Sequence, residues 1–270
     1  MLSHTTYKHP SATEWVTFVH GAGGSAAIWF KQIKAFKAHY NVLLLDLRGH
    51  GNSKDIATNQ AYTFSVIAND VMEVLDANNI VQSHFVGISL GTIIIRQIAA
   101  SNPNRVISLT MAGAIMKLNI RSQILMRLGM ISKSFIPYLL LYKFFAYIIM
   151  PRKNHRNSRL LFINEAKKLN QQEFIKWFRL STEVNPLLRQ FRNTSLNLPC
   201  LYIMGNEDAM FLPSIKKLVA AQYQNSKLVV ANQCGHVVNI DQPDYFNKKV
   251  LAFLKIHSTI QLGAKLTIIT

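Results

Sequence analysis

Short apolar runs alternate with longer helical segments along the first 113 residues. The apolar runs are bounded by polar or glycine-containing stretches, which is typical of buried strands. They predict strands over residues 14–19, 41–45, 84–86 and 106–111. Between the strands we expect helices over residues 26–38, 63–79 and 90–100. Strands separated by helices of this length indicate a mostly parallel central sheet with helices on both faces, that is, an α/β fold.

The alternation stops at residue 114 and returns near residue 199. The intervening segment contains no convincing strand and predicts several helices, broken at Pro137, Pro151 and Pro186. Two strands and one helix follow, over residues 199–204, 227–231 and 244–255. We therefore expect an α/β core with an inserted helical cap and a C-terminal tail of unknown role. The core comprises residues 1–113 and 198–256, the cap residues 114–197 and the tail residues 257–270.

Residues 135–150 form the most apolar stretch of the predicted cap. They span sixteen positions and include Pro137 and Lys143, so they fall short of the roughly 20 apolar residues that cross a bilayer. We expect a cap helix whose apolar side lines a pocket. The side chains assigned to that lining are Phe135, Ile136, Leu139, Leu140, Phe144, Phe145 and Ile148.

Charge is distributed unevenly along the 270 residues. The formal net charge is +17, and residues 114–197 hold fifteen Lys and Arg against three Glu. Basic surfaces attract nucleic acid, but no recognition motif is present, so no nucleic-acid partner is expected. We interpret the charge as a solvated face that keeps an apolar cap soluble. The alternative is a surface that attracts an anionic substrate carrier, especially at Arg152, Lys153, Arg156 and Arg159, or an anionic membrane.

The remaining composition predicts a protein without cofactor or metal. Cys200 and Cys234 have neither metal-ligand spacing nor the pattern of a disulfide framework, and the nine histidines are scattered. Cys234 is interpreted as buried packing. Residues 1–10 lack the apolar run of a signal peptide, so a cytoplasmic location is expected. The oligomeric state stays open.

Residues 87–91 read Gly-Ile-Ser-Leu-Gly and lie between a predicted strand and a predicted helix. A serine in such a tight turn is strained and exposed for attack, and the helix N-terminus favours developing negative charge. Gly87 and Gly91 remove the side chains that would collide in the turn. The context predicts that Ser89 is a nucleophile.

A glycine-rich loop, His-Gly-Ala-Gly-Gly-Ser at residues 20–25, follows the first predicted strand. Backbone N–H groups of such a loop can face a reacting carbonyl, and we expect Ala22 and Leu90 to supply the two donors of an oxyanion hole. A phosphate-binding loop is the alternative, but neither of its usual glycine patterns is present. His20 is interpreted as a structural residue that holds the loop.

The partners that activate a serine follow the last two predicted strands. A serine hydroxyl needs a neutral imidazole to take its proton, and the imidazole needs a carboxylate to fix its tautomer. Residues 205–208 read Gly-Asn-Glu-Asp, and His236 follows Gly235. Ligands of α/β sheets bind at the carboxyl ends of strands. We therefore expect His236 and either Glu207 or Asp208 to lie beside Ser89.

Four ordered motifs make residues 14–255 resemble the α/β-hydrolase family. They are HGAGGS at 20–25, DLRGHGNS at 46–53, GISLG at 87–91, and GNED at 205–208 with GHVVNIDQP at 235–243. The resemblance implies a cap after the sixth core strand and selects Asp208 rather than Glu207 as the acid, giving the order Ser89, Asp208, His236. One departure is Thr92, where many relatives have Gly or Ala.

The second motif contains polar residues that we interpret as loop-fixing rather than catalytic. These are Asp46, Arg48 and His50. The serine at position 89 separates the chain from haloalkane dehalogenase and epoxide hydrolase relatives, which use an aspartate there.

The motifs predict a serine hydrolase that cleaves a carboxylic ester or thioester with an apolar acyl group through an acyl-Ser89 intermediate. Its partner is then a small molecule, free or on an anionic carrier. Carbon–carbon bond hydrolysis or lyase chemistry on the same fold is an alternative, because a fold does not fix its substrate. A receptor with little turnover is another, although a receptor does not need all three groups of a catalytic triad.

Overall fold

A computed structural model describes most of the chain, with gaps in the first long loop, in the segment before residue 136 and at the C-terminus. The described residues are 1–54, 62–118, 123–124, 127, 129, 136–194, 196–222 and 225–258. They include a seven-stranded sheet in the order β1-β3-β2-β4-β5-β6-β7. The strands are β1 (His4–Tyr7), β2 (Trp15–Val19), β3 (Asn41–Leu45), β4 (Ser83–Ile88), β5 (Val106–Ala112), β6 (Cys200–Gly205) and β7 (Ser226–Ala231).

Strand direction confirms the predicted α/β fold. β1 pairs antiparallel with β3, and every other pair of neighbours is parallel. Each of the six predicted strands corresponds to one of the strands β2 to β7, and its predicted ends differ from the observed ends by at most two residues. β1 was not predicted, because its sequence, HTTY, contains no apolar run. As an edge strand it is only partly buried.

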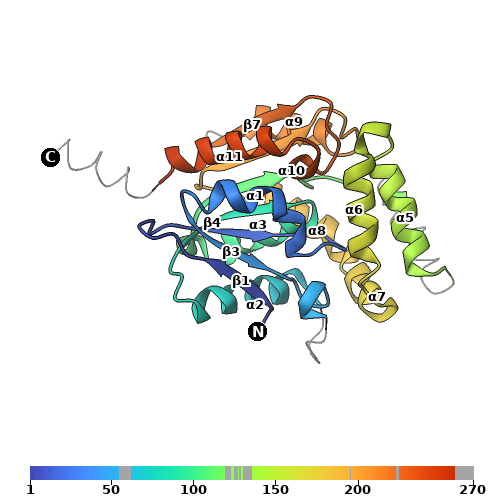
Figure 1. Cartoon of the computed structure of the whole chain (residues 1–270). Coiled ribbons are helices and arrows are strands. Elements are labelled where there is room, and N and C mark those ends of the chain that lie inside the picture. Colours follow the sequence, from blue (N-terminus) through green and yellow to red (C-terminus); the bar gives the residue numbers. More distant parts are fainter. Residues whose placement is uncertain are drawn as a thin grey trace.

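Helices cover both faces of the sheet (Figure 1). On one face, α2 (Phe64–Ala77), α3 (Leu90–Ser101) and α9 (Leu212–Gln222) share a buried apolar cluster. On the other, α1 (Phe30–Phe36), α10 (Val238–Asp241) and α11 (Pro243–Ile256) share a second one. Short 3-10 turns occur at η1 (Ala26–Trp29), η2 (Gly51–Ser53) and η3 (Pro103–Arg105).

Helix α2 shows how the sequence specifies one of these elements. The Thr63 side chain accepts a hydrogen bond from the Val66 N–H at 3.1 Å and so caps the helix N-terminus. Ile67, Val71 and Val74 recur at intervals of three and four residues and are fully buried against the sheet. The helix therefore begins at its cap and follows its apolar stripe.

Between β5 and β6 the described elements are all helical. They are α5 (Tyr138–Ile149), η4 (Lys153–His155), α6 (Arg156–Ala166), α7 (Gln171–Arg179) and α8 (Ser181–Asn193). Helices α5, α6 and α7 stand beside the sheet (Figure 1) and share a small apolar cluster that includes Leu141, Tyr142 and Phe174. Helix α8 instead buries Val184, Leu188 and Phe191 in the cluster shared with α2 and α3.

Two details of the predicted insertion are wrong. Pro186 does not break a helix but lies inside α8, where its exposed ring is accommodated on the solvent side and the chain stays helical because the opposite face is buried. The insertion follows β5, which is the fifth and not the sixth strand of the described residues. Residues 259–270 of the predicted tail lie outside the described part of the chain.

The apolar stretch around α5 does not make a membrane span. Across the described residues, no helix combines the length and the apolar character needed to cross a bilayer.

Candidate active site

Ser89 occupies the sharp turn between β4 and α3. Its backbone has φ 54° and ψ −121°, a conformation that costs a non-glycine residue energy and is typical of functional sites. The turn fits because Gly91 lies against β2: a Cβ there would come within 2.4 Å of the Val19 carbonyl oxygen. A Cβ at Gly87 would lie 2.8 Å from the Gly91 carbonyl oxygen. Both glycines are therefore required by close backbone contact.

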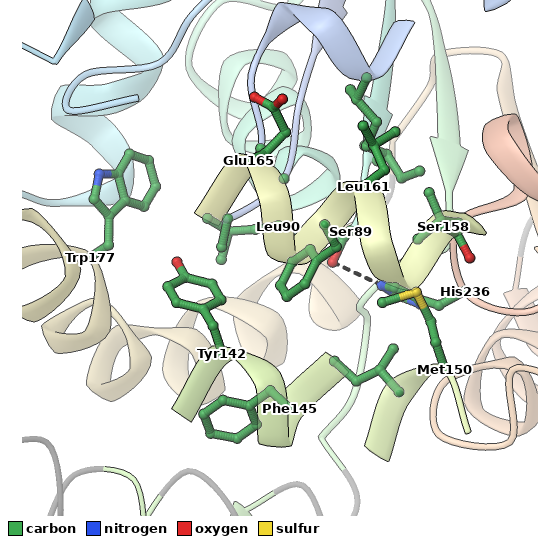
Figure 2. Close-up of a pocket in the computed structure, with 18 of the residues that line it drawn as sticks. Ser89, Leu90, Tyr142, Phe145, Met150, Ser158, Leu161, Glu165, Trp177 and His236 are labelled. Carbon is green, nitrogen blue, oxygen red and sulfur yellow. Dashed lines mark hydrogen bonds between the residues drawn. The ribbon is translucent and has the colours of Figure 1, made fainter. Parts of the chain in front are cut away.

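Hydrogen bonds join Ser89 to His236 and His236 to Asp208. The Ser89 Oγ lies 2.9 Å from the His236 Nε2, as Figure 2 shows, and the His236 Nδ1 lies 2.8 Å from the Asp208 Oδ2. Asp208 and His236 are buried, with 1% and 3% of their surfaces exposed. The Asp208 carboxylate can accept a hydrogen bond from the Nδ1–H, which leaves Nε2 to accept the hydrogen bond of the Ser89 hydroxyl.

The carboxyl ends of β4, β6 and β7 bring these three side chains together. Asp208 follows β6, and its Oδ1 accepts a hydrogen bond from the Phe211 N–H at 3.1 Å. His236 follows β7 and packs against Gly113 at the end of β5. Gly113 has φ +48°, and a Cβ there would lie 2.4 Å from the His236 carbonyl oxygen. Parallel strands thus deliver residues distant in sequence to one edge of the sheet.

The loop at residues 20–25 lies directly against the serine turn. A Cβ at Gly21 would meet the Ser89 Cβ at 3.1 Å and the Leu90 N at 3.6 Å. Ala22 and Leu90 both line the cavity that contains Ser89. No hydrogen bond from either N–H to another described group is found. The two predicted donors therefore line the same cavity as Ser89.

Buried histidines hold this loop against the segment after β3. The His20 Nδ1–H donates to the Gly21 carbonyl at 2.8 Å, and its Nε2 accepts from the Leu47 N–H at 3.0 Å. The His50 Nε2 accepts from the Gly23 N–H at 2.9 Å. Burial lowers the pKa of His50 to about 3, with a further contribution from neighbouring His20, and burial lowers the pKa of His20 as well. Both rings are therefore neutral structural groups.

The other two polar residues of the second motif also fix loops. Asp46 accepts hydrogen bonds from the N–H groups of Ala26 and Asn52 at 2.7 and 2.8 Å. Arg48 forms a two-pronged ion pair with Asp70 on α2, with both contacts at 2.5 Å. These contacts agree with the interpretation of Asp46, Arg48 and His50 as loop-fixing.

Glu207, the neighbour of Asp208, points to the inserted helices and not to His236. It accepts hydrogen bonds from Arg152 at 2.6 Å, His155 at 2.7 Å and Asn154 at 2.8 Å, all in or beside η4. The hydrogen bond from Asn154, with those of His155 and the charge of Arg152, lowers the pKa of the Glu207 carboxyl. Glu207 therefore ties η4 to the sheet edge.

A mostly apolar cavity of about 240 Å³ opens at Ser89. Figure 2 shows side chains from α5, α6 and α7 surrounding the Ser89–His236 hydrogen bond. The lining from these helices and the adjoining turns consists of Tyr142, Phe145, Ile149, Met150, Ser158, Leu161, Phe162, Glu165, Phe174, Trp177 and Phe178. The described residues of the lining include no Lys or Arg, although the chain as a whole carries a net charge of +17.

The predicted pocket-facing side of residues 135–150 is mostly wrong. Of the side chains assigned to it, only Phe145 lines the cavity, whereas Leu140 and Phe144 are more than half exposed. Phe135 lies outside the described residues. Because α5 is apolar around most of its circumference, periodicity could not indicate which face turns inward.

Glu165 is a buried carboxylate in the cavity wall that sequence reasoning missed. Its Oε2 accepts a hydrogen bond from the Ser25 hydroxyl at 2.6 Å, and its Oε1 lies 2.6 Å from the Lys168 Nζ. Ser25 in turn accepts from the Ala27 N–H at 3.2 Å. A helix of the insertion thus contacts the loop at residues 20–25. Nothing in the sequence pairs positions 25 and 165, which are joined only by tertiary packing.

Two of the four basic residues assigned to anion attraction have partners within the protein. Arg152 pairs with Glu207, and Arg159 donates to the carbonyls of Met150 and Arg152. Lys153 and Arg156 are exposed.

The thiols and the other potential metal ligands do not form a second centre. Cys200 and Cys234 are both free and buried, and burial raises the pKa of the Cys200 thiol to about 12. Within the part of the chain that the structure describes, no group of three or more His, Cys, Asp or Glu could hold a metal ion.

A mostly parallel sheet with a serine turn after a central strand, and an acid and a histidine after later strands, defines the class of α/β hydrolases. The family model described as "alpha/beta hydrolase fold" matches residues 14–243, and the chain belongs to this family. The prediction of an α/β-hydrolase enzyme is confirmed at that level.

Curated relatives and solved structures are similar along most of the chain. "Putative carbamate hydrolase RutD" of Acinetobacter baylyi is 26% identical over 273 residues, which cover 94% of this chain and 98% of the relative. "3-oxoadipate enol-lactonase 1" of the same organism is 24% identical, covering 91% and 90%. The crystal structure of a hydrolase from Pseudomonas aeruginosa PA01 superposes with a TM-score of 0.78 at 24% identity, over 94% of each chain.

Proposed function

We propose that the protein hydrolyses a carboxylic ester or thioester with an apolar acyl group through an acyl-Ser89 intermediate. The observation that carries the proposal is the hydrogen-bond series from Asp208 through His236 to Ser89, which ends at an apolar cavity. The names of the two curated relatives support the same reaction class, since both describe hydrolysis at a carbonyl group.

Acylation begins with proton transfer from the Ser89 hydroxyl to the His236 Nε2. The Ser89 Oγ forms a bond to the substrate carbonyl carbon, and the carbonyl oxygen takes up the negative charge. Asp208 accepts the Nδ1–H and stabilises the imidazolium. When the tetrahedral intermediate collapses, the bond to the leaving alcohol or thiol breaks, and the Nε2–H protonates that leaving group.

The N–H groups of Ala22 and Leu90 stabilise the charge on the carbonyl oxygen. Both residues line the cavity beside Ser89, and Leu90 is the first residue of α3. The positive end of the helix dipole adds to the stabilisation. One such donor contributes on the order of 10²–10³-fold in rate.

Deacylation repeats the same steps with water as the nucleophile. His236 takes a proton from the water, the water oxygen attacks the acyl carbonyl, and the Ser89 oxygen leaves with the proton from Nε2. The products are a carboxylic acid and the free enzyme. No cofactor takes part in this sequence.

A panel of substrates tests the proposal. We expect turnover of p-nitrophenyl esters or acyl-CoA thioesters, with a preference for acyl chains that the apolar cavity accepts. Ser89→Ala should lower kcat/KM by about 10³-fold or more. Ser101→Ala, at the exposed end of the same helix, should keep the wild-type rate. Undiminished hydrolysis by Ser89→Ala, or no turnover of any member by the wild type, would contradict the proposal.

A further inference from the structure

Helix α5 presents apolar side chains on two opposite faces. Its inner face contributes Tyr142, Phe145 and Ile149 to the cavity. Its outer face, which we define as Leu140, Lys143, Phe144 and Tyr147, is turned to solvent. Leu140 is 54% exposed, Phe144 55% and Tyr147 57%. Spacings of three and four residues place these side chains in one stripe along the helix.

Two more large apolar side chains, one before α5 and one on the adjoining helix α6, are exposed. Ile136, just before α5, is 37% exposed, and Leu160 on α6 is 46% exposed. Helices α5 and α6 pack against one another, and α5 lies on the outer side of α6, away from α11 (Figure 1). Soluble proteins seldom expose a contiguous set of large apolar side chains without a binding role.

Basic side chains lie in and near the outer face of α5. Along the chain, the first acidic residue after the start of α5 is Glu165 on α6. Lys143 is exposed within the stripe itself. The Arg159 guanidinium stacks 4.4 Å from the centre of the Tyr147 ring. Lys153 and Arg156 are exposed at the junction of α5 and α6. No Asp or Glu occurs between residues 77 and 164, so α5 and η4 themselves carry no acidic side chain. The acidic side chain that contacts η4 is Glu207, which is paired with Arg152 and leaves Lys143, Lys153 and Arg156 as the exposed cations.

We propose that the outer face of α5 docks the protein on an anionic lipid bilayer. Leu140, Phe144 and Tyr147 would enter the boundary between headgroups and acyl chains, and Lys143, Lys153 and Arg156 would meet lipid phosphates. An anionic bilayer binds a protein surface on which large apolar side chains lie beside basic ones. A second copy of the chain is a poorer occupant, because a two-fold contact would bring like charges together.

Docking in this orientation would also bring the cavity at Ser89 close to substrates that dissolve in the membrane, if the proposed function holds. The two faces of α5 belong to a single helix, so the membrane surface and the cavity at Ser89 would be separated by the thickness of that helix. An acyl compound that partitions into lipid would then be concentrated close to the cavity. The docking proposal itself does not depend on the reaction, since it is tested by binding.

Vesicle co-sedimentation of the full chain tests the proposal. The wild type should sediment with vesicles of phosphatidylcholine mixed with phosphatidylglycerol, and much less with phosphatidylcholine alone. Leu140→Ser with Phe144→Ser should lower the partition coefficient at least about tenfold, because two apolar side chains no longer enter the bilayer. Lys143→Gln should lower it roughly fivefold at low salt. Circular dichroism shows whether each variant remains folded.

Matched variants on the core provide the control. Val81 and Phe30 are 75% and 55% exposed, so Val81→Ser with Phe30→Ser removes as much exposed apolar surface away from α5. This variant should bind like the wild type. Equal binding to both kinds of vesicle, or wild-type binding by the folded α5 variant, would overturn the proposal. So would a wild-type dimer that the α5 substitutions dissociate without any vesicle binding.

Discussion

Two adjacent carboxylates at the end of β6 have different partners. Asp208 accepts the Nδ1–H of His236, whereas Glu207 holds Arg152, Asn154 and His155 of the insertion. The sequence alone leaves either acid as a candidate, and the resemblance to the family selects Asp208. The hydrogen bonds show the physical difference between them.

Exchanging each acid for its amide should separate the two roles. Asp208→Asn leaves the His236 tautomer unfixed, and we expect kcat to fall by roughly 10³- to 10⁴-fold with an unchanged melting temperature. Glu207→Gln should keep most of kcat and lower the melting temperature, because the ion pair to η4 is lost. Steady-state kinetics and thermal unfolding of both variants measure these effects on kcat and on the melting temperature. A larger loss of kcat in Glu207→Gln would reverse the assignment.

Among the described residues that line the cavity, Glu165 is the acidic side chain and no Lys or Arg occurs; its partner Lys168 lies outside that lining. An acyl group that ends in a carboxylate would therefore enter an apolar space beside a buried negative charge. We predict that such a substrate has a kcat/KM lower by about tenfold or more than a neutral substrate of equal length.

Glu165→Gln should narrow that difference by accelerating the carboxylate-bearing substrate selectively. Glu183→Gln, on α8 and outside the cavity lining, is the matched control and should preserve the difference. The measurement is kcat/KM for the pair of substrates with each variant. If wild-type enzyme prefers the charged substrate, the cavity does not select acyl groups by charge.

At the scale of elements, strands were predicted well and the inserted helices less well. Strands of a parallel sheet are buried on both faces, so β3, whose sequence is NVLLL, appears as a nearly continuous apolar run. The polar edge strand β1 and the orientation of α5 depend on packing that the local pattern does not record. Glu165 reaches Ser25 across 140 residues, a contact that no local signal indicates. The motif residues were predictable because they lie at strand ends.

Helix α8 continues through Pro186, which has no N–H to donate to the carbonyl of residue 182. Because the Pro186 side chain is exposed, an alanine there can complete the hydrogen-bond ladder without disturbing the core. We predict that Pro186→Ala raises the unfolding free energy by about 1 kcal/mol, less than the full cost of an interior proline because the unfolded chain gains freedom.

Chemical denaturation of Pro186→Ala beside Asn185→Ala measures this effect. Residue 185 is the exposed neighbour, and its change leaves the backbone hydrogen bonds intact. A Pro186→Ala protein that is no more stable than Asn185→Ala would show that the ring itself stabilises α8.

At the scale of the whole molecule, buried neutral histidines couple stability to pH. His50 has an ordinary pKa of 6.5, which burial lowers to about 3 in the folded protein. The unfolded chain therefore binds a proton between these values that the folded protein does not bind. The unfolding free energy should fall as the pH drops from about 6.5 towards 3, and His20, whose pKa is also lowered, should steepen the fall.

Urea unfolding across this pH range checks the expected slope. His50→Gln can keep hydrogen bonds to Gly23 and Arg48 without titrating, so it should reduce the slope by close to one proton. His39→Gln, at an exposed position, should leave it unchanged. Identical slopes for all three proteins would show that His50 takes up its proton in the folded state.

Covalent labelling by a fluorophosphonate, which phosphonylates an activated serine, tests whether Ser89 is the nucleophile. The wild-type protein is treated with a fluorophosphonate, digested, and its peptides are mapped by mass spectrometry. We expect a single adduct on Ser89 that requires native structure and is absent from Ser89→Ala. An adduct on another residue of the wild type, or equal labelling of Ser89→Ala, would contradict this role of Ser89.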